Sequence, residues 1–209
     1  MTGVQTCALP ISLPNVIKPT NPHDPSGSSG SGFFVSSDGT ILTVAHVVRD
    51  CKKILVGSVY LNPTPARLLV SDPVTDMAAI RIYNVKPPAI LSVFDERSGR
   101  GDLDIVGYPG DVPGLVATQT NGKIRADRPP SGQGLDSRPY VWFDSPAVRP
   151  GFSGGPIIGP NGDAIGAVVG HVTTTRRSDS QVVSETKRGV GASTRDRKST
   201  RLNSSHVAL

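Results

Sequence analysis

The sequence predicts an all-β protein, and three observations lead to this class. Short runs rich in Val, Ile, Thr and aromatic residues recur along the chain, separated by Gly, Pro, Asn or Asp. No segment shows the apolar spacing of a convincing amphipathic helix. The 209 residues are 36% hydrophobic and include 23 glycines and 19 prolines, which is enough for a core and for many turns. We therefore expect a barrel or a sandwich of short strands.

The expected strands fall into two groups. A polar segment rich in Pro, Ser and Gly leads into the first group, which starts with a hairpin signature, two apolar runs around a Ser-Asp-Gly turn. The first group comprises residues 33–48, 52–61, 66–72 and 77–83. A Pro-containing stretch at 84–102 interrupts the pattern. The second group comprises residues 103–110, 115–124, 140–145, 156–159 and 164–172.

The two ends of the chain match the two strands of one DNA sequence. If Met1 is read as GTG and residues 2–11 as ACT GGA GTT CAG ACG TGT GCT CTT CCG ATC, the reverse complement encodes DRKSTRLNSSH, which is residues 196–206. Chance does not explain eleven consecutive complementary codons, and the DNA resembles a sequencing adapter. We interpret residues 1–11 and 196–209 as adapter-derived and exclude them from the expected fold.

Several classes of protein become less favoured without these ends. The formal net charge falls from +5 to +3, because the tail carries three cations and one Asp, and so small a charge does not indicate a nucleic-acid surface. Cys51 is then the remaining cysteine, so no disulfide is expected within residues 12–195. No apolar run approaches the roughly 20 residues of a membrane-spanning helix.

Ser153, in RPGFSGGPIIG, is the first candidate for chemistry. Its surroundings fit both the G-x-S-x-G elbow of α/β-hydrolases and the G-x-S-G-G-P segment of trypsin-like proteases. A serine nucleophile needs a histidine base, an acid that orients this base, and donors for the oxyanion. Of the four histidines, His46 at the end of an expected strand is the best-placed base. A Gly-rich turn remains the alternative reading of Ser153 considered alone.

Three further segments share one resemblance. The chain resembles the HtrA family of trypsin-like serine proteases in three segments. The histidine segment is GSGFFVSSDGTILTVAHVV, the aspartate segment is VSDPVTDMAAIRI, and the serine segment is DSPAVRPGFSGGPIIGPNGDAIGAVV. RGVGAST near residues 188–194 resembles the last barrel strand of that family. The order His46, Asp76, Ser153 is that of chymotrypsin-type enzymes and differs from α/β-hydrolases and subtilisins. Asp72, which precedes a proline, competes with Asp76 for the acid role.

The resemblance implies a fold and a role for each residue. It implies two antiparallel six-stranded β-barrels with the active site in the cleft between them. His46 would be the general base, Asp76 would orient it, and Ser153 would be the nucleophile. The backbone N–H groups of Gly151 and Ser153 would form the oxyanion hole, and a glycine at 151 can turn its N–H toward the pocket at little steric cost.

The expected protease domain spans residues 30–195, after a flexible segment at 12–29. Its first barrel would cover about 30–86 and its second about 99–194. Phe152 departs from the family pattern, which often has Asn there, and its bulky ring could alter the oxyanion loop or merely cover it. The loop at 125–140 has no clear match in the family.

The specificity pocket is expected to be small and apolar. Ala147 stands six residues before the serine, where trypsin itself carries its pocket acid, so a preference for Arg or Lys is not supported. Ala167, Val168 and Val169 would supply the apolar walls. A small or medium aliphatic side chain before the scissile bond fits such a pocket.

The expected function is that of a serine endopeptidase acting on unfolded or extended protein segments. The alternative is a catalytically inactive module of the same fold that binds peptides or partner proteins, and an esterase could use the same triad. No cofactor or metal is expected, because no His, Cys or carboxylate cluster has ligand spacing. The expected partner is a protein or peptide substrate, without nucleic acid. Resemblance alone favours a homotrimer and a bacterial periplasmic, envelope or secreted location.

Overall fold

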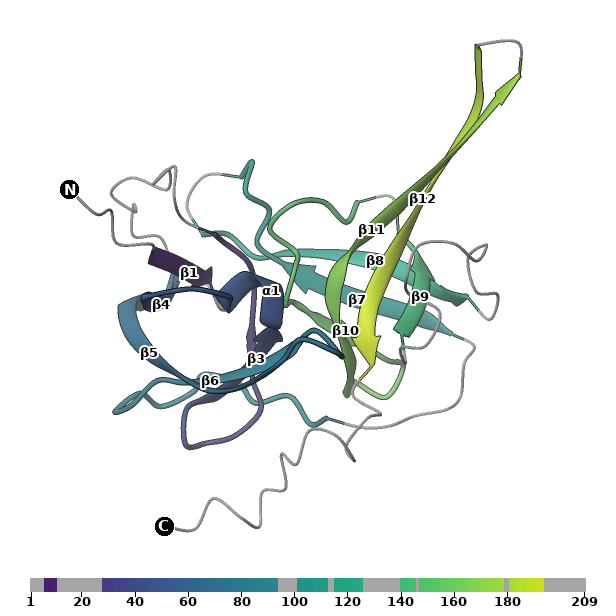
Figure 1. Cartoon of the computed structure of the whole chain (residues 1–209). Coiled ribbons are helices and arrows are strands. Elements are labelled where there is room, and N and C mark those ends of the chain that lie inside the picture. The colour runs from purple at the N-terminus through teal and green to yellow at the C-terminus, as the bar shows by residue number, and fades with distance from the viewer. Residues whose placement is uncertain are drawn as a thin grey trace, which may run out of the picture.

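The structure, a computed structural model, describes residues 6–10, 28–93, 101–112, 115–125, 140–145, 147–178 and 181–193. Within these residues it is almost entirely β-structure, arranged as two six-stranded units side by side (Figure 1). The predicted fold class, two barrel-like units of the chymotrypsin type, is confirmed.

The first unit is a curved, open sheet that forms a half-barrel. Its spatial order is β1-β4-β5-β6-β3-β2. In that order the strands are Thr6–Pro10, Lys53–Ser58, Leu61–Asp72, Met77–Arg81, Thr40–Val44 and Phe33–Phe34. All neighbouring strands are antiparallel except β1, which pairs in parallel with β4. One turn of helix, α1 (Ala45–Val48), follows β3.

The second unit is a closed antiparallel barrel in the order β10-β11-β12-β9-β8-β7. In that order the strands are Pro156–Ile158, Ala164–Ser178, Gln181–Ser193, Tyr140–Asp144, Thr118–Arg125 and Asp102–Gly107. Pairing of β10 with β7 closes the barrel. β11 and β12 are much longer than the sequence pattern predicts, and their hairpin extends well beyond the barrel (Figure 1).

Each unit has its own hydrophobic core, and β11 joins the two. The first core is built from fully buried residues of β3, α1, β4 and β6, and it also contains Ala164 and Ala167 of β11. The second core contains Phe143, Phe152 and Ile157, all fully buried. A single strand therefore contributes side chains to both cores.

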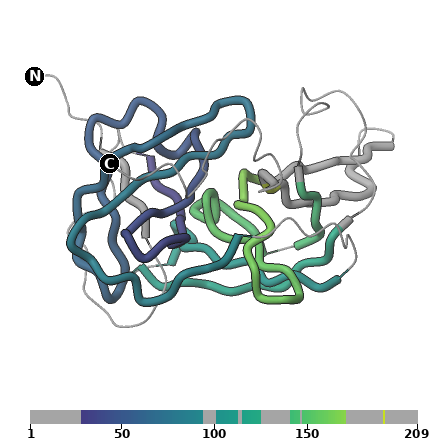
Figure 2. The backbone as a smooth tube through the Cα atoms, turned by 90° about the horizontal axis from the view of Figure 1, so that it is seen from below, coloured from purple at the N-terminus to yellow at the C-terminus, as the bar shows by residue number. Residues whose placement is uncertain are grey.

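The segment that connects the two units also holds them together. The Leu91 N–H donates to Phe34 O at 2.9 Å in the first unit, and the Ala164 N–H donates to Ser92 O at 2.8 Å in the second. Val93 forms an isolated parallel bridge with Ala164. The tube in Figure 2 shows the two units from a second direction.

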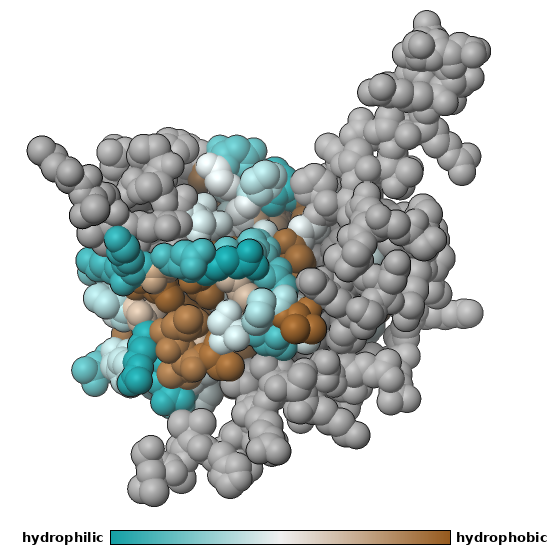
Figure 3. All heavy atoms as spheres, in the orientation of Figure 1, coloured by the Kyte–Doolittle hydropathy of each residue, from teal (hydrophilic) through white to brown (hydrophobic). Residues whose placement is uncertain are grey.

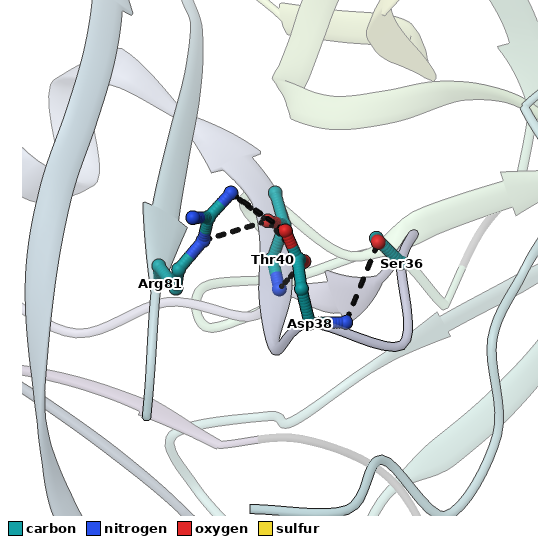
Figure 4. Close-up of polar contacts among 4 residues, drawn as sticks. All are labelled: Ser36, Asp38, Thr40 and Arg81. Atoms are coloured by element: carbon teal, nitrogen blue, oxygen red, sulfur yellow. Dashed lines mark hydrogen bonds and ion pairs between the residues drawn. The ribbon is translucent and has the colours of Figure 1, made fainter. Parts of the chain in front are cut away.

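The expected Ser-Asp-Gly turn connects β2 to β3 and is fastened by Asp38 (Figure 4). Its Oδ1 accepts the Thr40 N–H at 3.0 Å and the Thr40 hydroxyl at 2.6 Å. The Nη2 of Arg81, in β6, lies 2.7 Å from Asp38 Oδ2. Burial alone would raise the pKa of Asp38, but hydrogen bonds with Thr40 and Ser36, together with the Arg81 charge, lower it below its ordinary 3.8.

Two features involve residues that the sequence argument excludes. Thr6–Pro10 lies alongside Lys53–Gly57 as strand β1. Cys51 is disulfide-bonded. If residues 1–11 and with them Cys7 are set aside, the sequence predicts an unpaired Cys51. Strands β2 to β6 lie within residues 33–81, and β7 to β12 within 102–193. The adapter origin of residues 1–11 and 196–209 stays a prediction.

The surface of the first unit is partly apolar. Figure 3 shows apolar residues gathered over this unit on the face of Figure 1, bordered by hydrophilic ones. Among the exposed large hydrophobic residues are Leu68 and Leu69 of β5. In the part of the chain that the structure describes, no helix has the length and apolar character needed to cross a membrane.

Candidate active site

His46 and Asp76 form a hydrogen-bonded pair in the first unit. The His46 Nδ1 lies 2.6 Å from Asp76 Oδ2, and the His46 backbone N–H donates to Asp76 Oδ1 at 2.9 Å. An ionised carboxylate only accepts hydrogen bonds, so the proton of this contact lies on Nδ1. The other ring nitrogen, Nε2, is then left as an acceptor. The side chain of His46 is 37% exposed, whereas that of Asp76 is 9% exposed.

The local fold explains why these two residues meet. β3 pairs with β6 so that Val44 is opposite Met77, which places the residues just beyond each strand end side by side. The Ala45 N–H donates to Asp76 O at 2.8 Å. Asp76 has a φ of 57°, a left-handed conformation that Asp tolerates better than most residues. Backbone and carboxylate of Asp76 together fix the start of α1.

Asp72, the competing acid, has a different task. Its Oδ1 accepts the Val74 N–H at 2.8 Å, and its Oδ2 accepts the Thr75 hydroxyl at 2.8 Å. These bonds hold the turn between β5 and β6. The structure thus pairs Asp76 with His46, and it uses Asp72 as a turn residue.

Ser153 lies where the two units meet, in a segment of residues 149–155 that we call the serine loop. The Ser153 carbonyl accepts the Ser31 N–H at 2.6 Å from the first unit. A Cβ added to Gly30 would lie 2.7 Å from both Ser153 O and a methyl of Val47, the residue after His46. The Ser153 hydroxyl donates to Val169 O at 3.2 Å. Among the hydrogen bonds of the described residues, none joins this hydroxyl to the His46 ring.

Some backbone N–H groups of the serine loop are hydrogen-bonded and others are not. The Phe152 N–H donates to Arg149 O at 3.1 Å, and the Gly154 N–H donates to Val168 O at 2.7 Å. The Gly155 N–H donates to Phe152 O at 2.8 Å. Within the described part of the chain, the N–H groups of Gly151 and Ser153 have no acceptor. These two N–H groups are therefore free to donate, which is one requirement for groups that stabilise an oxyanion.

Two glycines of the serine loop are required by the backbone. Gly151 has a φ of 101° and Gly154 a φ of 87°, values that residues with a side chain rarely adopt. A Cβ at Gly151 would also overlap Tyr108 O, and one at Gly154 would overlap Ser31 O. The unusual Gly content of this segment therefore has a steric reason.

Phe152 does not cover the site. Its side chain is fully buried in the core of the second barrel. The Phe152 ring packs among apolar side chains of this core, where the amide of an Asn would be unfavourable. The departure from the family pattern is therefore accommodated by packing. The ring anchors the serine loop to the barrel below it.

The expected pocket residues fall into two groups. Ala167 and Val168 are fully buried and belong to the first and second cores, respectively. Ala147 and Val169 are only half-buried, and Val169 O contacts the Ser153 hydroxyl. Ala147 and Val169 therefore remain the candidates for pocket walls.

Three residues at the site were missed by the sequence reasoning. The buried Ser31 hydroxyl donates to Gly151 O at 2.6 Å and accepts the Tyr108 N–H at 2.9 Å. Arg149 Nε donates to Asp111 Oδ1 at 2.9 Å. This hydrogen bond lowers the pKa of Asp111 below its usual range, despite a smaller opposing effect of desolvation. The Gly-Ser-Gly motif before β2 was the only available signal for Ser31, and no pattern linked Arg149 to Asp111.

His23 and His206 lie outside the described residues, as does the loop at 126–139. Within the described ranges, no group of three His, Cys, Asp or Glu side chains is placed to hold a metal ion.

Two β-barrel-like units, a paired His and Asp, and a serine in a Gly-rich loop are features that chymotrypsin-type proteases share. The family described as Trypsin-like peptidase domain matches residues 30–170. The chain belongs to this family of trypsin-like peptidases, and its relatives are of the HtrA type.

Named relatives and solved structures agree with this assignment. A protein of Chlamydia trachomatis named "Probable periplasmic serine endoprotease DegP-like" is 35% identical over 154 residues, which are 74% of this chain and 30% of that protein. One of the same name from Pseudomonas putida is 33% identical over 158 residues, 71% of this chain and 32% of that protein. The chain thus spans about a third of the length of these relatives.

Among solved structures, the HtrA-type protease AlgW with tripeptide has a TM-score of 0.60 at 28% identity, covering 79% of this chain and 52% of AlgW. The Rv3671c protease from M. tuberculosis in its active form has a TM-score of 0.61 at 26% identity, covering 81% of this chain and 70% of that one.

Proposed function

We propose that this protein is a serine endopeptidase that cleaves unfolded or extended protein segments through His46, Asp76 and Ser153. The observation that carries the proposal is the hydrogen-bonded pair of His46 and Asp76 together with the two unbonded N–H groups of Gly151 and Ser153. The names of the relatives, serine endoproteases and HtrA-type proteases, support the same activity.

The chemistry follows from the proton positions. Asp76 holds the Nδ1 proton of His46, so Nε2 is the acceptor for the Ser153 proton. Catalysis would require the Ser153 hydroxyl to turn from Val169 O, its acceptor in the structure, to His46 Nε2. The Ser153 oxygen then attacks the scissile carbonyl, its proton passes to His46 and later to the leaving amine, and water releases the acyl group by the same route. Asp76 stabilises the imidazolium that forms in each half-reaction.

The oxyanion of each tetrahedral intermediate would accept hydrogen bonds from Gly151 and Ser153. Loss of one such donor typically lowers kcat by about 10²- to 10³-fold. Ala147 and Val169 are uncharged and half-buried, which supports cleavage after a small or medium aliphatic residue.

The setting of the enzyme is proposed from its relatives. Relatives named as periplasmic support a bacterial periplasmic or envelope location. A homotrimer, and the lack of a nucleic-acid partner, stay predictions that rest on family resemblance and on the modest charge.

The test is cleavage of unstructured casein and of peptides with Val or Ala before the scissile bond. Wild type should cut both and should react with a fluorophosphonate probe, whereas Ser153→Ala should do neither. His46→Ala should retain only the residual rate supplied by binding and the oxyanion hole. A metal chelator should leave the rate unchanged. A folded wild type that neither cuts nor reacts with the probe would contradict the proposal and favour a peptide-binding module.

A further inference from the structure

Ser31 is a buried residue of the first unit whose polar groups contact the serine loop and its surroundings. Its side chain is 1% exposed. Its hydroxyl donates to Gly151 O at 2.6 Å, and its N–H donates to Ser153 O at 2.6 Å. The same hydroxyl accepts the Tyr108 N–H at 2.9 Å, and the Ser31 carbonyl accepts the Thr43 hydroxyl at 2.8 Å. Ser31 therefore binds both ends of the tripeptide that carries the two unbonded N–H groups.

We propose that Ser31 is a positioning residue that keeps the oxyanion hole formed in the absence of substrate or activator. This inference rests on the proposed function. Ser31 touches no reacting atom, and it acts through the backbone of Gly151 and Ser153.

The geometry of the peptide bond supplies the reason. In a planar trans peptide the C=O and the next N–H point in opposite directions. The Gly110 N–H donates to Pro150 O at 3.1 Å, which turns the Gly151 N–H away from Gly110. On the other side of Gly151, the Ser31 hydroxyl fixes the carbonyl and the Phe152 N–H is bonded to Arg149 O. Both peptide units that flank Gly151 are thereby held.

Loss of the Ser31 hydroxyl would release one of these two restraints. Gly151 has no side chain that opposes rotation, and its partly buried carbonyl would lose its donor, which favours rotation of the peptide toward another donor. The Ser31 hydroxyl restrains the peptide unit between Gly151 and Phe152, and rotation of that unit would shift Ser153 relative to the Gly151 N–H. The oxyanion would then lose one of its two donors, while the residues that bind substrate side chains would be unchanged.

The experiment compares Ser31→Ala with Ser58→Ala. Ser58 is a matched control, because its buried hydroxyl also accepts backbone hydrogen bonds, from Tyr60 and Leu61 at 3.0 Å, in a turn of the same unit away from the serine loop. Ser31→Ala should lower kcat by roughly 10²-fold with KM changed less than about threefold. Its affinity for a peptide aldehyde, whose adduct carries an oxyanion, should fall in parallel with kcat. Ser58→Ala should lower Tm similarly without either effect.

A second variant keeps the proposal testable should Ser31→Ala fail to fold. Ser31→Cys retains a weak donor of similar size. If both variants fold, the kcat and the aldehyde affinity of Ser31→Cys should lie between those of wild type and of Ser31→Ala. If only Ser31→Cys folds, both values should lie well below those of wild type. Wild-type kcat in either folded variant would overturn the positioning role. An inactive wild type that also resists fluorophosphonate would instead refute the proposed function, so the two failures are distinguishable.

Discussion

At the scale of single residues, Asp76 combines a chemical and a structural task. Its carboxylate binds both the ring and the backbone N–H of His46, and its carbonyl binds Ala45. Because all three bonds converge on the first turn of α1, the histidine has little freedom to leave the acid. The pair is thus fixed before any substrate arrives.

Replacement of Asp76 by Asn separates these tasks. Asn tolerates the left-handed φ and keeps an oxygen for the His46 N–H, so the fold should survive with a small change in Tm. The amide would favour the wrong tautomer of His46, and kcat at neutral pH should fall by about 10⁴-fold, as it does when the acid of a serine protease triad is changed in this way. Steady-state kinetics and thermal melting measure both. Activity within tenfold of wild type would remove Asp76 from the proposed mechanism.

The residues of this pair could be predicted from sequence because each lies next to a strand end within a long motif match, although His46 belongs to the helical turn α1 and not to the strand. Ser31 could not, since a serine between two glycines looks like flexible chain until the second barrel is placed against it. The same limit applies to Phe152, whose ring could be assigned to the core only when Leu103 and Ile105 of β7 were seen around it.

At the scale of elements, the turn between β2 and β3 depends on one carboxylate. Asp38 joins the turn to β6 through Arg81. The pKa of Asp38 is lower in the folded protein than its ordinary 3.8, so the folded state binds fewer protons than the unfolded one near that pH. Its contribution to stability is complete above this range and is lost as pH falls through the folded pKa.

The variant Asp38→Asn tests this turn. It removes the ion pair and retains an amide oxygen for the Thr40 N–H, so the free energy of unfolding at pH 7 should fall by about 0.5 to 1 kcal/mol, the range of partly exposed pairs. The difference from wild type should narrow below pH 4, as measured by denaturant titration at several pH values. Asp102→Asn is the control, because its pair with Lys123, at 3.9 Å, is exposed. A difference independent of pH would contradict the assignment.

Strand positions were predictable where apolar runs alternate with turn residues, as in β3, β6 and β7. The length of the β11–β12 hairpin was not, because residues 171–178 are polar or charged except Val172 and carry no burial signal. Backbone pairing between β11 and β12 continues to Ser178 and Gln181 and extends these strands.

At the scale of the whole molecule, the excluded ends provide the next prediction. If residues 1–11 and 196–209 derive from adapter DNA, their sequence was not selected for packing, and separate deletion of each end should change Tm by less than about 2 °C. Thermal melting with and without a reductant would isolate the contribution of the Cys51 disulfide. A loss of several degrees on deletion of 1–11 would show that β1 is a genuine strand of the first sheet.

The general fold was predictable because strand periodicity and turn residues recur in two groups. Whether each sheet closes into a barrel could not be predicted, because the pattern of strands along the chain does not show whether the first and last strands of a sheet pair with each other. The second unit closes through the pairing of β10 with β7, while the first stays open beside β2. Contacts between distant segments decide this, and local sequence does not encode them.

Because β11 supplies Ala164 and Ala167 to the core of the first unit, the first half of the chain does not contain all the side chains that its own interior needs. We therefore expect the first unit to lose its structure whenever the second unfolds, in a single transition. A polypeptide released by the ribosome up to residue 93 would still lack part of its interior, so Ser153 and His46 can come together only after the second half has been synthesised.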